Sequence, residues 1–355
     1  MSGTSLDGVD AALLDLDGGK AAILGATHAA FDPDLRDALA ALTLTGPDEI
    51  DRAGALGNRL AAIYADACRR VLAEAGHAAA AVRAIGCHGQ TVRHRPERGY
   101  TVQIGNASLL AELTGISVVA DFRSRDVAAQ GQGAPLVPAF HVRAFSAPGE
   151  ARAVLNLGGI ANVTILAREG PTLGFDIGPG NCLMDLWTAR QLGEAYDRDG
   201  AWARSGTVDS GLLERMLAEA YFRAPPPKST GRELFNAAWL ERHLRPGIDP
   251  RDMQATLLEL TAATAARAIL EHARETQLVI ACGGGTRNTA LLQRLAQRLD
   301  PCLVESSDRH GFPAQWVEAA AFAWLAQQTL EGRAGNLPSV TGATGPRILG
   351  AIHQK

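Results

Sequence analysis

The sequence predicts an α/β protein of two domains around a central cleft. Three glycine-rich turns, at residues 3–8, 156–162 and 282–288, can each direct backbone N–H groups at an anion. The chain has 355 residues, more than one typical domain contains. Each turn alone would be an ordinary loop, so their spread along the chain is what favours one nucleotide held between two halves.

Composition narrows the class of protein. Hydrophobic residues make up 46% and charged residues 20% of the chain, as in ordinary globular proteins. The net charge of −4 exerts no general attraction on nucleic acid or anionic membrane, so neither is an expected partner. Five scattered cysteines without a CxxC pair indicate a reducing cytoplasm and disfavour a zinc site. No apolar run approaches the roughly 18 residues of a membrane span.

The first domain is predicted to span residues 1–140 and to be joined by the tail 336–355. A helix is expected from Pro47 to about Ala75. Apolar runs bounded by turn residues predict strands at 11–16, 21–26, 84–87, 101–104 and 116–120. The turn after the first of these runs, rich in Asp and Gly, is a strong hairpin signal.

The second domain is predicted to span residues 141–335 and to repeat the strand–turn pattern. Strands are expected at 153–157 and 278–281. Three helices follow from helical spacing of apolar residues, around 258–271, at 291–299 and at about 313–331. In the first of these helices, Glu259, Arg267 and Glu271 are expected on the polar face.

Asp176 is the strongest candidate for a catalytic residue. It stands at the end of an apolar strand, before a glycine-proline-glycine turn, where an open α/β sheet places functional groups. Such an aspartate can act as a general base, or it can cap the following helix. The three surrounding glycine-rich turns favour the base.

Polar residues that follow strands of the first domain are candidates for binding a polyhydroxylated ligand. Gln90 and Thr91 follow the strand at 84–87, whereas His88 is expected to make structural hydrogen bonds. The strand at 116–120 is followed by Asp121, Arg123 and Arg125, of which the arginines can clamp a carboxylate. Glu318 lies within an alanine-rich helix, where a carboxylate is costly unless it is used.

The segment from Lys228 to Glu233, KSTGRE, follows three prolines and allows two interpretations. It is either a mobile polar loop that closes on a ligand or the start of a helix capped by Ser229 or Thr230. The familiar nucleotide motifs are absent: there is no GxxxxGK[ST], and no glycine run has the spacing of the dinucleotide fingerprint.

The order of the three turns resembles the acetate-kinase, sugar-kinase, Hsp70 and actin superfamily, in which the first two hold phosphates and the third holds adenosine. Within it, the chain resembles the anhydro-N-acetylmuramic acid kinases over nearly its whole length. The matching segments occur in the family's order: MSGTSLDGVD, HGQT, YTVQIGNASLLAELTGISVVADFRSRD, GQGAPLVPAFH, NLGGIANV, GFDIGPGN, DRDGAWA, KSTGRE, CGGGTRN and VTGATGPRILG.

The resemblance implies an ATP- and Mg²⁺-dependent enzyme that opens 1,6-anhydro-N-acetylmuramic acid with water and phosphorylates O6, in cell-wall recycling. It also implies a cytoplasmic homodimer. Asp176 matches the base, and Gln90, Thr91, Asp121, Arg123, Arg125 and Glu318 are the expected sugar-binding residues. Nucleotide binding is expected from Gly3, Thr4, Ser5, Leu6, Asp7, Gly8, Val9, Asp10, Asn156, Gly158, Gly159, Gly178, Gly180, Asn181, Lys228, Gly283, Gly284, Gly285 and Asn288.

Two alternative functions stay open at this point. A related anhydrosugar kinase, such as one acting on levoglucosan, would keep the turns and the base but lack the carboxylate clamp. A non-catalytic Hsp70-like ATP-binding module is the other. Family members usually carry an apolar strand immediately before the residue that is Met1 here. We therefore expect a first strand to be missing and the true start to lie a few residues upstream.

Overall fold

The computed structural model describes residues 1–3, 6–17 and 21–355. It divides into two compact units, one of Met1–Ala144 with Trp316–Lys355 and the other of Phe145–Gln315. The sequence predicted residues 316–335 in the second domain, but the structure groups them with the first unit. The physical reason is that helix α12 (Val317–Leu330) packs against strands β1 and β3 of the first unit. No helix in the described part of the chain is long and apolar enough to cross a membrane.

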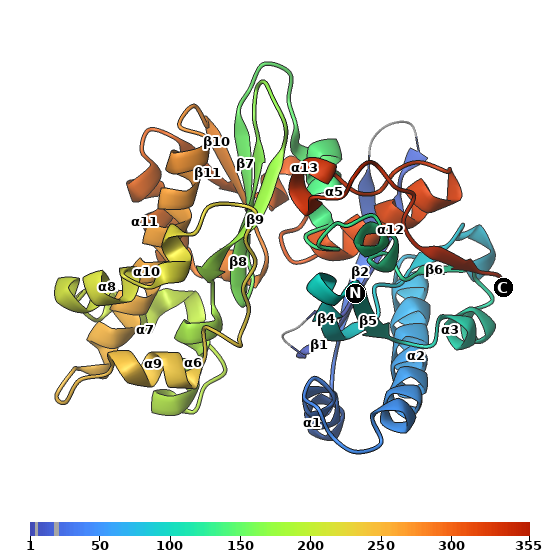
Figure 1. Ribbon diagram of the computed structural model, residues 1–355, viewed down its shortest axis with the longest axis horizontal. Helices are drawn as coiled ribbons and strands as arrows, with labels where there is room; N and C mark the ends of the chain where they lie inside the picture. The colour runs from blue at the N-terminus through green and yellow to red at the C-terminus, as the bar shows by residue number, and fades with distance from the viewer. Residues whose placement is uncertain (4–5, 18–20) are drawn as a thin grey trace. The chain divides into compact units, whose positions relative to one another are not determined.

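The first unit contains two small sheets and a hairpin (Figure 1). The antiparallel pair is β1 (Gly8–Asp15) and β2 (Ala22–Ala30). The three-stranded sheet has the order β12 (Ala351–His353), β6 (Val118–Ala120), β3 (Ile85–Gly86). The hairpin joins β4 (Gln90–Arg95) to β5 (Tyr100–Ile104).

Helices of the first unit cover these strands. The longest, α2 (Glu49–Glu74), packs on β1 and β2 through a buried stripe that includes Leu60, Tyr64 and Val71. The C-terminal tail contributes β12, which pairs with β6. Residues 336–355 were predicted to join the first domain, and the structure groups them with the first unit. The remaining helices of this unit are α1 (Pro33–Leu42), α3 (Ala107–Thr114), α4 (Ser124–Ala128), α5 (Val137–Phe145), which ends at the unit boundary, and α13 (Pro338–Thr341).

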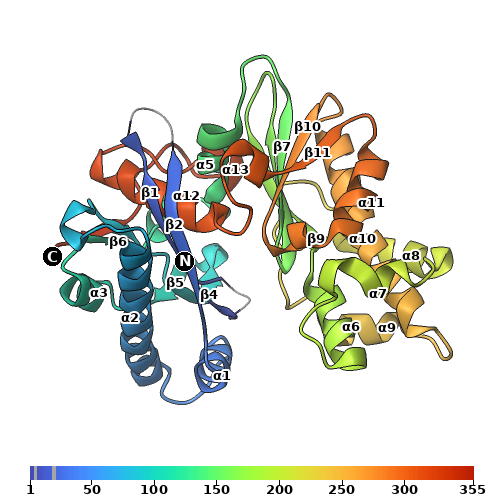
Figure 2. The ribbon, with the colours of Figure 1, turned by 180° about the vertical axis from the view of Figure 1, so that it is seen from behind.

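The second unit is built on one five-stranded sheet of order β11-β10-β7-β8-β9. Its strands are β7 (Arg152–Leu157), β8 (Ile160–Leu166), β9 (Leu173–Pro179), β10 (Leu278–Cys282) and β11 (Leu303–Ser306). Figure 2 shows its smaller helices grouped near α10 (Pro250–His272). These are α6 (Cys182–Leu192), α7 (Ala201–Arg204), α8 (Ser210–Leu217), α9 (Ala237–His243) and α11 (Thr289–Leu299).

The central helix α10 differs from the amphipathic helix that the sequence predicted. Glu259, expected on the polar face, is only 2% exposed. Arg294 Nη2 and Arg298 Nε, both from α11, donate to its Oε1 at 2.9 and 2.7 Å. Burial raises the pKa of Glu259, but the hydrogen bonds and charges of the two arginines outweigh burial and lower it overall. A buried carboxylate is tolerated here because it is doubly paired.

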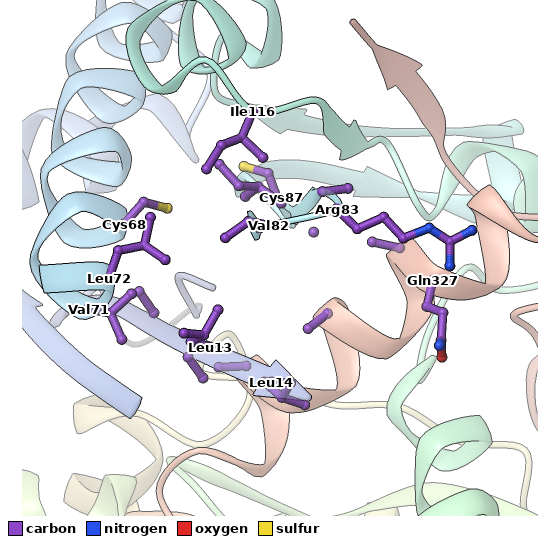
Figure 3. Close-up of a pocket in the computed structure, with 18 of the residues that line it drawn as sticks. Leu13, Leu14, Cys68, Val71, Leu72, Val82, Arg83, Cys87, Ile116 and Gln327 are labelled. Atoms are coloured by element: carbon purple, nitrogen blue, oxygen red, sulfur yellow. The ribbon is translucent and has the colours of Figure 1, made fainter. Parts of the chain in front are cut away.

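An apolar cavity of about 450 Å³ lies within the first unit (Figure 3). Side chains of β1 and α2 line it, among them Leu13, Leu14, Cys68 and Leu72, together with β3 and α12. Among the described residues, β1 pairs only with β2 and β3 only with β6. The cavity therefore borders two incomplete sheets.

Candidate active site

The second and third glycine-rich turns meet at one edge of the sheet of the second unit. Strands β7 and β10 are parallel neighbours, with Asn156 opposite Cys282, so the turns that follow them emerge side by side. A Cβ on Gly285 would lie 2.7 Å from Leu157 Cβ, and one on Gly283, at φ +84°, would lie 2.4 Å from Asn156 Oδ1. Only glycine permits this close approach of the two turns.

The turn after β9 is joined to the turn after β7 by backbone hydrogen bonds. Gly180 N–H donates to Gly159 O at 2.9 Å, and Asn181 N–H donates to Gly158 O at 2.8 Å. The Asn181 side chain donates to Leu157 O at 3.0 Å. The predicted residues Asn156, Gly158, Gly159, Gly180, Asn181 and Gly283–Gly285 are therefore brought together. The amides of Gly180 and Asn181, however, are already used in building the turn, so they differ from the free phosphate donors that the sequence suggested.

Gly178 and Asn288 of the expected nucleotide site have structural partners. Gly178 adopts φ +147°, and a Cβ there would lie 2.6 Å from the Phe222 ring. Asn288 caps α11, because its Oδ1 accepts the N–H of Leu291 at 3.0 Å. Both residues shape the surroundings of the turns.

Asp176 lies inside β9, five residues before Asn181, the N-cap of α6. It therefore does not cap the following helix, which removes that alternative. Its Oδ2 accepts the Ser229 hydroxyl at 2.9 Å and the Thr230 N–H at 3.1 Å. No helix begins at Ser229 or Thr230, since α9 starts at Ala237 with Asn236 as its cap. The capping interpretation of this segment is wrong, and its polar groups bind the candidate base instead.

Lys228 belongs to the same segment, but its ammonium lies on the other face of β9. It sits 5.8 Å from the Phe175 ring centroid and lines a cavity of about 230 Å³ with Phe175 and Ile177. Since side chains alternate along a strand, Asp176 points to the opposite face. Burial and the charge of Arg267 lower the pKa of Lys228.

The first glycine-rich turn belongs to the first unit. Thr4 and Ser5 lie outside the described residues, while Gly3, Leu6 and Asp7 precede the start of β1 at Gly8. Val9 is buried in the core, so its side chain contributes packing at this turn. Asp10 Oδ1 accepts from His28 Nδ1 at 2.7 Å. Gln90, also buried, donates from Nε2 to Gly3 O at 3.1 Å and so ties the turn to β4.

Arg123 and Glu318 are part of one electrostatic cluster in the first unit. Burial and the charges of Asp10 and Asp7 raise the pKa of Glu318, while Arg123 opposes the rise. Arg123 donates from Nε to His88 Nε2 at 3.0 Å and from Nη1 to Gly133 O at 2.6 Å. Burial and the Arg123 charge hold the pKa of His88 well below its usual value, so its ring is neutral and accepts this bond. The structural role expected for His88 is confirmed.

The other expected sugar-binding residues differ in their surroundings. Arg125 of α4 is exposed and makes no ion pair among the described residues. Asp121, at φ +57°, accepts the Ser124 hydroxyl at 2.5 Å, so one of its oxygens serves its own turn. Thr91 Oγ1 accepts from Gln103 Nε2 at 3.2 Å.

Three residues beside these turns were not predicted from the sequence to act at the site. Tyr221 donates its hydroxyl to the backbone carbonyl of Asp176 at 2.7 Å. Ser229 holds the Asp176 carboxylate, and a Cβ on Gly159 would lie 3.5 Å from Arg232 Nη2. Ser229 and Arg232 both lie in KSTGRE, whose polar composition after three prolines was the available signal.

Comparison with known proteins gives a consistent result. The profile of the family described as "Anhydro-N-acetylmuramic acid kinase" matches residues 1–355. A protein of that name from Pseudomonas putida is 53% identical over 355 residues, covering 99% of this chain and 98% of the relative. Another, from Chromobacterium violaceum, is 54% identical over 359 residues and covers 100% and 98%.

Solved structures show weaker likeness. A ROK hexokinase from Thermus thermophilus is 18% identical, with a TM-score of 0.33 over 90% of this chain and 100% of that one. The family assignment therefore rests on the sequence relatives. Because the family profile matches the whole chain and relatives of that name share about half of its residues, the chain belongs to the anhydro-N-acetylmuramic acid kinase family.

Proposed function

We propose that this kinase opens the internal 1,6-anhydro bond of 1,6-anhydro-N-acetylmuramic acid with water and transfers the γ-phosphoryl of ATP to O6. The product is N-acetylmuramic acid 6-phosphate, which returns cell-wall sugar to metabolism. Family membership supports the kinase activity and removes the non-catalytic ATP-binding module as an alternative. The observation that carries the proposal is the Asp176 carboxylate. Two donors hold it within β9, the strand whose following turn is hydrogen-bonded to the glycine turn after β7.

In this mechanism, Asp176 accepts a proton from the water that attacks C1. The C1–O6 bond breaks, and O6 leaves with the electron pair and attacks the γ-phosphorus, so that ADP departs. Phosphoryl transfer demands positioning and charge neutralisation more than covalent chemistry. Arg232, beside Gly159 in the turn after β7, would supply positive charge to the phosphates.

Mg²⁺ binding fits the carboxylates near the first turn. The described residues contain no group of three or more His, Cys, Asp and Glu that could hold a metal. Mg²⁺ on a nucleotide, however, needs only one or two carboxylates besides phosphates and water. Asp7, just before β1, and Asp10, within it, would supply these carboxylates at the first turn. The ion would neutralise phosphate charge.

Cytoplasmic location and a homodimer are also part of the proposal. All five cysteines are free thiols, which is consistent with a reducing compartment. Light scattering of the purified protein measures its mass in solution. Twice the chain's 37.3 kDa would support the dimer, and a single chain's mass would exclude it.

The test is Asp176→Asn, which keeps size and polarity but removes the base. We expect ATP binding and the melting temperature to be retained while turnover falls by roughly 10² to 10⁴-fold. A coupled ADP assay measures turnover with the anhydro-muramic sugar and, in parallel, with levoglucosan. Near-normal turnover of a folded Asp176→Asn would exclude Asp176 as the base. Preference for levoglucosan in the unaltered enzyme would exclude the proposed substrate.

A further inference from the structure

The carboxylate of Asp176 is held by a segment far away in the sequence. The Ser229 hydroxyl and the Thr230 N–H both donate to Oδ2, at 2.9 and 3.1 Å. The Asp176 N–H in turn donates to Lys228 O at 3.2 Å. Residues 228–230 therefore contact β9 through one backbone hydrogen bond and two donors to one carboxylate oxygen.

Contacts between Lys228 and Tyr221 hold this segment against β9. Lys228 Nζ donates to Tyr221 O at 3.3 Å and lies 4.9 Å from the centroid of the Tyr221 ring. The Tyr221 hydroxyl donates to the Asp176 carbonyl at 2.7 Å. Lys228 and Tyr221 together fix the backbone from which Ser229 and Thr230 reach the carboxylate.

Two titratable side chains, Tyr221 and Lys228, lie beside Asp176 and the segment that holds it. Burial, followed by the charges of Asp176 and Glu233, raises the pKa of Tyr221, so its hydroxyl stays protonated and donates. Lys228 lies against Phe175, on the other face of β9. Ser229 is exposed, and an exposed serine has no packing reason to occupy this position.

We propose that Ser229 is a positioning residue for the general base, holding the Asp176 carboxylate together with the Thr230 amide in the orientation and charge state that proton abstraction needs. This inference rests on the proposed function of Asp176. Hydrogen bonds from neutral donors to a carboxylate favour its ionised form, and two bonds to one oxygen restrict rotation of the group. Ser229 acts through Asp176 and requires no contact with the sugar or nucleotide.

The test compares Ser229→Ala with two matched variants in the full-length chain. Ser229→Thr keeps a hydroxyl, and Thr230→Ala keeps the backbone N–H that makes the second bond. For Ser229→Ala we expect kcat to fall about tenfold and the acidic limb of the pH–rate profile to move up by about one pH unit, because the ionised base loses a donor. The KM for ATP should stay unchanged, and Ser229→Thr should restore turnover and the pH profile. Thr230→Ala should move the acidic limb less than Ser229→Ala does, because its N–H remains.

The double variant Ser229→Ala with Asp176→Asn separates this inference from the proposed function. If Ser229 acts through the base, the double variant is no slower than Asp176→Asn alone. An unchanged pH profile for Ser229→Ala, with Asp176→Asn inactive, overturns the positioning role and leaves the base in place. An active Asp176→Asn overturns both. If Ser229→Ala melts early, Ser229→Cys, of similar size but with a weak donor, carries the same expectation.

Discussion

Arg123 and Arg125 are two residues apart, but only one of them is committed to the protein. Arg123 donates hydrogen bonds to His88 and to Gly133 O, and its charge opposes the rise in the pKa of Glu318. Arg125 is exposed and makes no ion pair within the described residues. An uncommitted arginine is the better candidate for binding the lactyl carboxylate of a muramic sugar.

Arg125→Ala should therefore weaken binding of the anhydro-muramic sugar about tenfold or more, because a charge-assisted hydrogen bond is lost. Binding of an anhydro-glucosamine analogue without the lactyl group should change little. Isothermal titration with both ligands measures the difference. Equal losses would show that Arg125 does not recognise the carboxylate. Arg123→Ala serves as the comparison, since it should also lower the melting temperature.

Glu318 predicts a pH dependence of stability. Its folded-state pKa is raised by burial and by the charges of Asp10 and Asp7. A raised carboxyl pKa means that the folded state binds the proton more tightly than the unfolded state. The stabilisation of the folded state that comes from this raised pKa is fully present below the pKa of Glu318 in the unfolded chain. It is lost as pH rises through the pKa of Glu318 in the folded protein.

Glu318→Gln should accordingly melt a few °C higher than the unaltered protein near neutral pH, since a partly desolvated charge is removed. The difference should disappear in acid, where Glu318 is protonated in both states. Turnover should fall, because the carboxylate is expected to hold the sugar. Thermal scans at several pH values decide the matter, and a difference in melting temperature that does not vary with pH contradicts the assignment.

At the scale of elements, two adjacent glycines of the third turn, Gly284 and Gly285, differ in the space around them and can be compared by substitution. A Cβ on Gly285 would lie 2.7 Å from Leu157 Cβ and 2.9 Å from Asn181 Oδ1, whereas one on Gly284 would meet nothing within 4 Å. Gly285→Ala should cost about 1–3 kcal/mol of stability through overpacking, and it should weaken ATP binding by separating the turns. Gly284→Ala should leave the melting temperature unchanged. If both variants melt alike, the packing of the turns is not what requires glycine.

Helices and strands can be predicted from the sequence where a local pattern of residues specifies them. The strands at β7 and β10 and the helix α2 lie where apolar periodicity predicts them. Pairings between distant segments do not follow from such patterns. The bond between Ser229 and Asp176 spans 53 residues, and Glu259 is buried only because α11 supplies two arginines to it. The grouping of α12 with the first unit is likewise decided by its packing on β1 and β3.

At the scale of the whole molecule, the two units contain different parts of the proposed chemistry. The second unit has Asp176 with its Ser229 and Thr230 donors, and the second and third glycine turns. The first has Glu318, Arg123 and the first turn. Only the intact chain can therefore test whether hydrolysis and phosphoryl transfer belong to one reaction.

Turnover of 1,6-anhydro-N-acetylmuramic acid with ATP in ¹⁸O-labelled water is the most direct test of the central claim. If water activated by Asp176 attacks carbon, mass spectrometry of the product will find the label in the hydroxyl on C1 and none in the oxygen that bridges C6 and phosphorus. Label in that bridging oxygen, or product without label at C1 before exchange can occur, would contradict the account.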